Sequence, residues 1–298
     1  MIVHIMSEAH GLIMQEAFKR VGIYTLLITL LHLTIRAALD ALRDKSESWA
    51  SVLSPSSSNR PISPVSHNAT KKECDEERKQ GGGNDAFRVT NMLVNLVLGC
   101  TGLYFWFALI PKECSDIVKA GLLFKKQTNL ENRCISTSFF AEAQAAYQIW
   151  SIVMGSIIRE QPIMMFHHFA VLSITSLQIY TCMFEYYAVF FFGTVEISSV
   201  FLSIMNLFKD HPALAKQNPT CFTVAKILFA ASFLMMRVYL WLPMMYDFIR
   251  QTVVFFLEKG SLFYGILVAL STTPSIFLTL LQMWWAQKIV HGLYSMIK

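Results

Sequence analysis

Charged residues are scarce in this sequence. Asp, Glu, Lys and Arg make up 15% of its 298 residues, whereas a soluble domain carries about 25%. Hydrophobic residues reach 54%, and the mean hydropathy is +0.44. This composition is typical of a protein built for lipid. The formal charge of +5 does not indicate a nucleic-acid partner, because no block of Lys and Arg alternates with aromatic residues in a polar region.

Closely spaced cysteines are also absent. The six cysteines include no CxxC pair, and Cys100 and Cys182 fall inside apolar runs, where a thiol behaves as a small hydrophobic group. The sequence therefore predicts neither a disulfide framework nor a zinc ribbon. No internal repeat is visible, which disfavours a transporter built from inverted repeats.

Long apolar runs are what the sequence has instead. About 20 residues cross a hydrocarbon core of about 30 Å at a rise of about 1.5 Å per residue. The sequence predicts seven such helices, or six if the first run, which carries His32 and Arg36, does not span. The runs cover residues 21–39, 90–110, 137–158, 163–183, 188–208, 223–242 and 262–289. We therefore expect an all-α, multi-pass transmembrane helical bundle.

A polar stretch separates the first run from the others. Residues 43–88 combine a Ser- and Pro-rich segment, a charged segment and three glycines. Because such a composition buries little apolar surface, we expect a disordered insert. The chain then divides into residues 1–42 with the first helix, this insert, and a membrane domain over residues 89–298. Asn68 is a formal glycosylation acceptor, which matters only if the insert is lumenal.

The runs 163–183 and 188–208 are separated by four residues, which predicts an antiparallel membrane hairpin. Both helices carry polar side chains that lipid disfavours, since an ionisable group at bilayer depth costs about 2.5–3.5 kcal/mol on insertion scales. Helical spacing places these groups on one face of each helix. The stripes are His168, Thr175 and Gln178 on the first helix, and Glu196, Ser199, Ser203 and Asn206 on the second. Two facing polar stripes predict a cavity inside the bundle.

His167 and His168 are the candidates for chemistry, since imidazole acts as a general base or a nucleophile near neutral pH. The alternative is structural, with one ring inside the bundle and the other at the headgroup boundary. Adjacent histidines point about 100° apart around a helix, so we expect no metal site. Glu196 lies about 10 Å along the hairpin from His168 and needs a water or a substrate to reach it. We also expect an ion pair between Glu196 and Arg237, whose estimated depth is similar.

Three short motifs resemble the TLC-domain family, which includes proteins of the TRAM, Lag and CLN types. They are NRCIST at residues 132–137, PxxxxHH at 162–168 and TxEISSxFL at 194–202. The resemblance extends over residues 85–298 and implies a barrel of six membrane helices around a lipid-accessible cavity, with one extra N-terminal helix. It also implies a location in the endoplasmic reticulum.

The resemblance further implies a role in lipid homeostasis, by binding a sphingolipid-like lipid or by transferring an acyl group to it from acyl-CoA as co-substrate. His167, His168 and Glu196 would be catalytic. The lipid contacts would be Thr175, Gln178, Ser199, Ser203, Asn206 and Arg237. Ceramide synthases carry two aspartates where this chain has one glutamate, so uncharacterised TLC-domain proteins are more similar to it.

The alternative function is a non-catalytic lipid sensor or a cargo receptor of the reticulum. Membrane lipid is the expected partner, and the sequence leaves open whether the chain forms a homo-oligomer.

Overall fold

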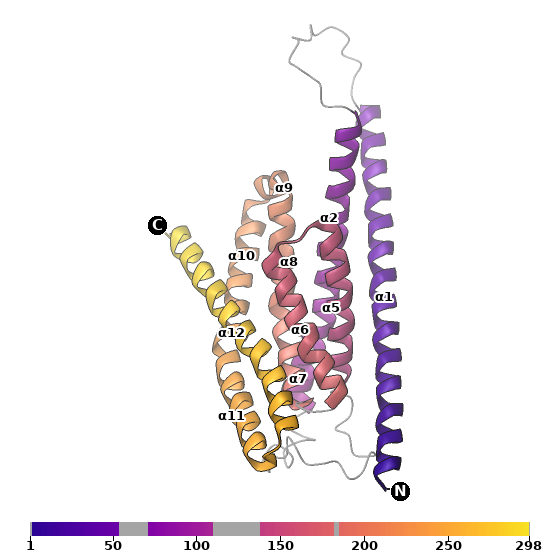
Figure 1. Cartoon of the computed structure of the whole chain (residues 1–298). Helices are drawn as coiled ribbons and strands as arrows, with labels where there is room; N and C mark the ends of the chain where they lie inside the picture. Colours follow the sequence, from indigo (N-terminus) through magenta and orange to yellow (C-terminus); the bar gives the residue numbers. More distant parts are fainter. Residues whose placement is uncertain (1, 54–70, 110–137, 182–184, 298) are drawn as a thin grey trace.

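The computed structural model describes residues 2–53, 71–109, 138–181 and 185–297, and every regular element in these ranges is a helix. This result confirms the expected all-α, multi-pass bundle. The helices run roughly along one direction, with α1 at one flank and α12 at the other (Figure 1). Because α1 starts and α12 ends toward opposite ends of the bundle, an odd number of crossings connects them.

The elements follow the chain in a simple order. They are α1 (Ile2–Leu53), α2 (Lys71–Tyr104), the π-helical turn η1 (Phe105–Leu109), α5 (Ser138–Ile158), α6 (Pro162–Thr181), α7 (Glu185–Phe192), the 3₁₀ turn η3 (Thr194–Glu196), α8 (Ile197–Asp210), α9 (Pro212–Gln217), α10 (Pro219–Leu234), the π-helical turn η4 (Met235–Tyr239), α11 (Trp241–Lys259) and α12 (Leu262–Ile297).

Six stretches of the described chain are long and apolar enough to cross a membrane. They are Met14–Arg43, Asn84–Ala108, Pro162–Thr181, Tyr186–Asp210, Pro219–Glu258 and Leu262–Ser295. The first expected run therefore meets the criterion, and α10, η4 and α11 join into one continuous stretch of 40 residues. The expected run 137–158 forms α5, which is too polar to count as a membrane-spanning helix by its hydropathy. It nevertheless packs inside the bundle against α1, α2 and α6.

The helix formed by α7, η3 and α8 lies at the centre of the bundle. In its most apolar window 67% of the residues are buried inside the protein, against 11–28% for the five other candidate spans. One hydrophobic cluster packs around its first half, with Tyr187, Phe190 and Val195 buried against Trp241 and Phe248. Residues at the middle of this helix are therefore shielded from lipid on several sides.

Glycines bring α2 against the middle of this central helix. A Cβ on Gly99 would lie 2.7 Å from the backbone nitrogen of Ile197, and one on Gly102 would collide with the backbone of Gly193 and Thr194. Close backbone approach at small residues is the usual way in which membrane helices pack. The contact fixes the 3₁₀ turn that carries Glu196.

Helical structure extends into both ends of the stretch expected to be a disordered insert. The helix α1 continues to Leu53, and α2 already begins at Lys71. Continuing an existing helix needs no new nucleation, and the segment after Lys71 is rich in Lys, Glu and Arg, which favour helix. Near the end of the insert Phe87 is fully buried and stacks on Trp150, with ring centroids 5.3 Å apart. Residues 54–70, with Asn68, lie outside the described residues.

Candidate functional site

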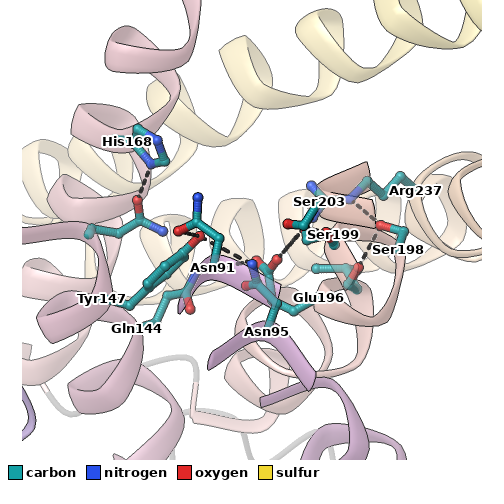
Figure 2. A network of polar contacts seen from close by, with 12 residues as sticks. Asn91, Asn95, Gln144, Tyr147, His168, Glu196, Ser198, Ser199, Ser203 and Arg237 are labelled. Carbon is teal, nitrogen blue, oxygen red and sulfur yellow. Dashed lines mark hydrogen bonds and ion pairs between the residues drawn. The ribbon is translucent and has the colours of Figure 1, made fainter. Parts of the chain in front are cut away.

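Glu196, at the end of η3, is buried in the middle of the bundle with 6% of its surface exposed. Its Oε2 accepts hydrogen bonds from Ser199 Oγ (2.7 Å) and Arg237 Nη2 (3.2 Å). Its Oε1 accepts one from Gln144 Nε2 (3.1 Å), so both carboxylate oxygens are engaged. The expected ion pair between Glu196 and Arg237 is confirmed by this contact (Figure 2).

Arg237 approaches this carboxylate from the π-helical turn η4, where it is 6% exposed. Its Nε donates to Ser198 Oγ (2.7 Å) and its Nη2 also donates to Ser199 Oγ (2.9 Å). Single π-helical turns inside α-helices often occur at functional sites. The two opposite charges compensate each other where an isolated charge would be costly.

Two glutamines on one face of α5 connect this ion pair with the histidines. Gln144 reaches Glu196, and one turn later Gln148 Oε1 accepts a hydrogen bond from His168 Nδ1 (2.6 Å). His168 Nε2 lies 3.7 Å from Oε2 of Glu160, which is in the turn between α5 and α6. His168 and Glu196 thus have separate partners on α5 (Figure 2).

A second set of polar contacts links α2 with α5. The hydroxyl of Tyr147 donates to Asn91 Oδ1 and accepts from Asn95 Nδ2, both at 3.1 Å. All three side chains are buried, and they lie beside the Glu196 cluster (Figure 2). These three residues were not predicted from the sequence to belong to the site. The signal that could have found them is the helical spacing of Asn91 and Asn95 within an apolar run.

A narrow cavity of about 40 Å³ lies on the other side of Glu196, between α6, α7, η3, η4, α11 and α12. Its apolar wall consists of Val171, Ile174, Leu177, Tyr187, Ala188, Phe191, Phe192, Trp241, Met245, Phe248 and Leu278. Its polar lining consists of His167, Gln178, Glu196, Arg237, Ser271, Ser275 and Gln282. The cavity therefore combines a largely apolar surface with a few polar groups, as ligand pockets do.

Three polar atoms on this lining are buried and have no hydrogen-bond partner among the described residues. They are His167 Nδ1, Gln178 Nε2 and Gln282 Oε1. A buried polar atom left unpaired costs about 1–3 kcal/mol. Such atoms are rare in folded proteins, and a cavity that holds several is suited to a ligand that pairs with them.

The structure separates the two adjacent histidines. His167 lies on the cavity wall, with its ring centroid 5.8 Å from that of Trp285 on α12. His168 is turned toward α5 and is bound to Gln148. Of the residues predicted to form the site, the cavity is lined by His167, Glu196, Gln178 and Arg237.

The other predicted site residues lie elsewhere. Thr175 donates to the backbone oxygen of Val171 (3.0 Å), and Ser203 donates to that of Ser199 (3.0 Å). The residues that line the cavity do not include Thr175, Ser203, Ser199 or Asn206. Their assignment to lipid contacts stays a prediction.

The cavity also includes polar residues of α12, which were not predicted from the sequence to belong to the site. Ser271, Ser275 and Gln282 of α12 line it. These three residues recur at helical spacing within an apolar run, which is the signal that could have identified them.

Ion pairs join the helix ends near His168. Arg88 of α2 donates to Asp210 Oδ2 (3.2 Å) at the end of α8 and to Glu160 Oε1 (3.4 Å). Asp85 lies 2.6 Å from His211 Nε2, which follows α8. These contacts connect the helices at the end of the bundle where α6 begins, close to His168.

A multi-pass membrane bundle with a buried ion pair and an adjoining internal cavity is the class of protein that this geometry defines. The chain matches the family model of the TLC domain over residues 86–291. It therefore belongs to the TLC-domain family, as the motifs indicated. No curated protein and no solved structure matches it.

Proposed function

We propose that this protein binds a membrane lipid in its internal cavity and acts in lipid homeostasis in the endoplasmic reticulum. The observation that carries the proposal is the cavity itself, where His167 Nδ1, Gln178 Nε2 and Gln282 Oε1 are unpaired within a mainly aromatic and aliphatic wall. A lipid supplies both kinds of partner, a polar head group for these atoms and a tail for the wall. Lipid also surrounds a membrane bundle, so the ligand is available to the cavity.

The width of the cavity limits what it accepts without rearrangement. At about 40 Å³ it is narrow, and a cavity of 10–15 Å³ on this measure already holds about one water molecule. A lipid with one tail requires side chains to move, and Met245 on the wall is suited to that because its unbranched chain is flexible. A lipid with two tails requires the helices themselves to separate.

Acyl transfer is the second candidate function, favoured by the position of His167. His167 lines the same cavity as Glu196, so a neutral imidazole there can take the proton from a lipid hydroxyl or amine as that group attacks the thioester carbon of acyl-CoA. The C–S bond then breaks, and CoA leaves as a thiol that takes this proton back from the imidazolium. Glu196 acts as a positioning residue in this reaction, because Gln144, Ser199 and Arg237 already engage its carboxylate.

Mass spectrometry of lipids that remain with the protein purified in mild detergent tests the binding. We expect a stoichiometric lipid in the wild type and less of it in His167→Phe, which enlarges a side chain on the wall. The matched control is Phe166→Leu, because Phe166 is 63% exposed and lies outside the cavity lining. Equal lipid content in all three proteins, or none in the wild type, contradicts the proposal.

The reaction is tested separately with acyl-CoA and a sphingoid base. Turnover that is lost in His167→Ala and partly kept in His168→Ala supports acyl transfer at the cavity. Bound lipid without turnover in the wild type supports a lipid sensor or cargo receptor instead.

A further inference from the structure

Four of the seven polar residues that line the cavity lie at one end of it, namely His167, Glu196, Arg237 and Gln282, whereas Gln178, Ser271 and Ser275 lie further along. Trp241 Nε1 donates to Thr279 Oγ1 (3.0 Å), which places these residues of α11 and α12 at the same level. The two helices run in opposite directions, since only the turn at Gly260 and Ser261 joins them. Arg237, one turn before Trp241, is therefore level with Gln282, nearly one turn after Thr279. Glu196 is bound to Arg237 and lies at this level too.

His167 belongs to the same end, because its ring lies 5.8 Å from that of Trp285, less than one turn beyond Gln282. Two of the three unpaired atoms, His167 Nδ1 and Gln282 Oε1, are thus together at the polar end. Gln282 is only 1% exposed, so solvent does not supply its missing partner. A carbonyl oxygen that lacks a donor is suited to a ligand that donates.

The polar end carries no uncompensated charge. Among the described lining residues, Glu196 and Arg237 carry opposite formal charges and form an ion pair with each other. An added carboxylate, phosphate or ammonium would be buried without a counter-ion of its own, which is strongly unfavourable. An uncharged head group avoids this cost.

The opposite end of the cavity is dominated by apolar side chains. Tyr187, Met245 and Phe248 form its wall there, and the Tyr187 hydroxyl is occupied because it donates to Asp247 Oδ2 (2.6 Å). The lining residues of α6 run from His167 to Gln178, which corresponds to about 16 Å along the helix. Gln178 Nε2 is the one unpaired atom at this end. An extended alkyl chain matches both the length and the wall.

We infer that the cavity takes a lipid with one tail and an uncharged head group that donates hydrogen bonds. The head group lies between His167 and Gln282, and the tail extends toward Phe248. This inference rests on the proposed lipid binding and adds to it the chemical class of the head group and its orientation.

Three probes with the same oleyl chain test the head group. They are 1-monooleoylglycerol, which is uncharged and has two hydroxyls, oleate and oleylamine. Binding of tritiated monooleoylglycerol to the full chain in detergent is measured in competition with each unlabelled probe. Monooleoylglycerol should displace the label, whereas oleate and oleylamine should be roughly a hundredfold less effective, because each brings an unpaired charge.

The Gln282→Leu variant tests the orientation. It should weaken monooleoylglycerol binding by about tenfold through the lost hydrogen bond. It should not lower the thermal midpoint of the lipid-free protein, since leucine has a similar volume and removes an unpaired polar atom. Gln282→Met serves as a second variant of the same kind. The control is Gln161→Leu, at an exposed glutamine outside the cavity, which should bind as the wild type does.

Each outcome decides the inference. Equal displacement by oleate or oleylamine overturns the uncharged head group, and unchanged binding in folded Gln282→Leu and Gln282→Met overturns its position, while lipid binding itself stands. If no probe binds but a lipid co-purifies with the protein, the identity of that lipid decides. A charged or two-tailed lipid overturns the inference, and an uncharged lipid with one tail supports it. If no probe binds and no lipid co-purifies, the proposed function falls together with it.

Discussion

Glu196 shows how neighbouring side chains stabilise a single carboxylate inside a membrane bundle. Its carboxylate receives hydrogen bonds from α5, from its own helix and from η4, through Gln144, Ser199 and Arg237. These contacts satisfy both oxygens and provide one full compensating charge. They also hold the carboxylate on the cavity wall in a fixed orientation.

Removing the positive partner tests this arrangement. Arg237→Ala should destabilise the protein by about 3–5 kcal/mol, because Glu196 then remains as an unpaired buried carboxylate. The thermal midpoint in detergent and the folded yield both measure this effect. Adding Glu196→Gln to Arg237→Ala should recover much of the loss, since no buried charge remains. A single variant as stable as the wild type would show that the ion pair does not form.

The sequence allowed prediction of some of these contacts but not others. The pairing of Glu196 with Arg237 follows from depth along the helices, which counting residues estimates. The contact of His168 with Gln148 depends on which face α5 presents to α6, and that is set by packing. Gln282 was missed because its helical spacing from Ser271 and Ser275 indicates a shared face of the helix but not that this face lines a cavity.

Packing of the helices depends on small residues where α2 meets the central helix. Gly99 and Gly102 on α2 face the backbone of η3 and the start of α8. Any side chain there pushes α2 away from the turn that carries Glu196. The close contact therefore supports both the fold and the position of the site.

Adding one methyl group measures how tight this contact is. Gly102→Ala should lower the stability by about 1–3 kcal/mol, because its Cβ collides with the backbone of Gly193 and Thr194. Gly292→Ala on α12 is the matched control, since nothing lies within 4 Å of a Cβ there. That variant should be neutral or gain up to about 1 kcal/mol of helix propensity. Equal thermal midpoints for the two variants would contradict the close approach.

The first helix is attached to the TLC domain by a bidentate ion pair. Arg20 Nε and Nη2 donate to the two carboxylate oxygens of Glu142 on α5, both at 2.7 Å. The side chain of Glu142 is 3% exposed and that of Arg20 is 39% exposed. Since α1 precedes the residues that match the family model, this contact joins an additional helix to the domain.

Breaking the contact should loosen α1 selectively. Arg20→Ala is expected to increase hydrogen–deuterium exchange in peptides around residues 14–24 and to leave α12 unchanged. The loss of stability should be smaller than for Arg237→Ala, because Arg20 is partly exposed. Lys19→Ala is the control, since its ion pair with Glu16 lies within α1 and is exposed. Unchanged exchange in Arg20→Ala would mean that apolar packing alone holds α1.

Length and hydropathy were sufficient to predict seven long helices of the bundle, including α1 and the polar α5, but not α9. They did not predict that α10, η4 and α11 form one continuous stretch, because the expected apolar run ended at residue 242. They also did not predict the helical ends of the polar insert. Both results follow from the continuation of helices that were already formed.

At the scale of the whole molecule, the central helix separates two different interiors. On one side α2 and α5 supply amides and a tyrosine that pair with one another and with His168. On the other side α6, α11 and α12 enclose the mainly apolar cavity. Glu196 belongs to both, since Gln144 reaches it from one side while it lines the cavity on the other. The proposed function therefore requires that lipid enters the cavity between α6, α11 and α12.

Photocrosslinking with a diazirine-bearing lipid tests most directly whether lipid enters the cavity, because it reports which side chains the lipid tail contacts. Met245 and Tyr246 are adjacent on α11, yet Met245 lines the cavity at 3% exposure and Tyr246 is 72% exposed. Peptide mapping should find adducts on Met245 and Phe248 that an excess of unlabelled lipid suppresses. Adducts confined to Tyr246 and other outward residues would contradict a lipid-binding cavity.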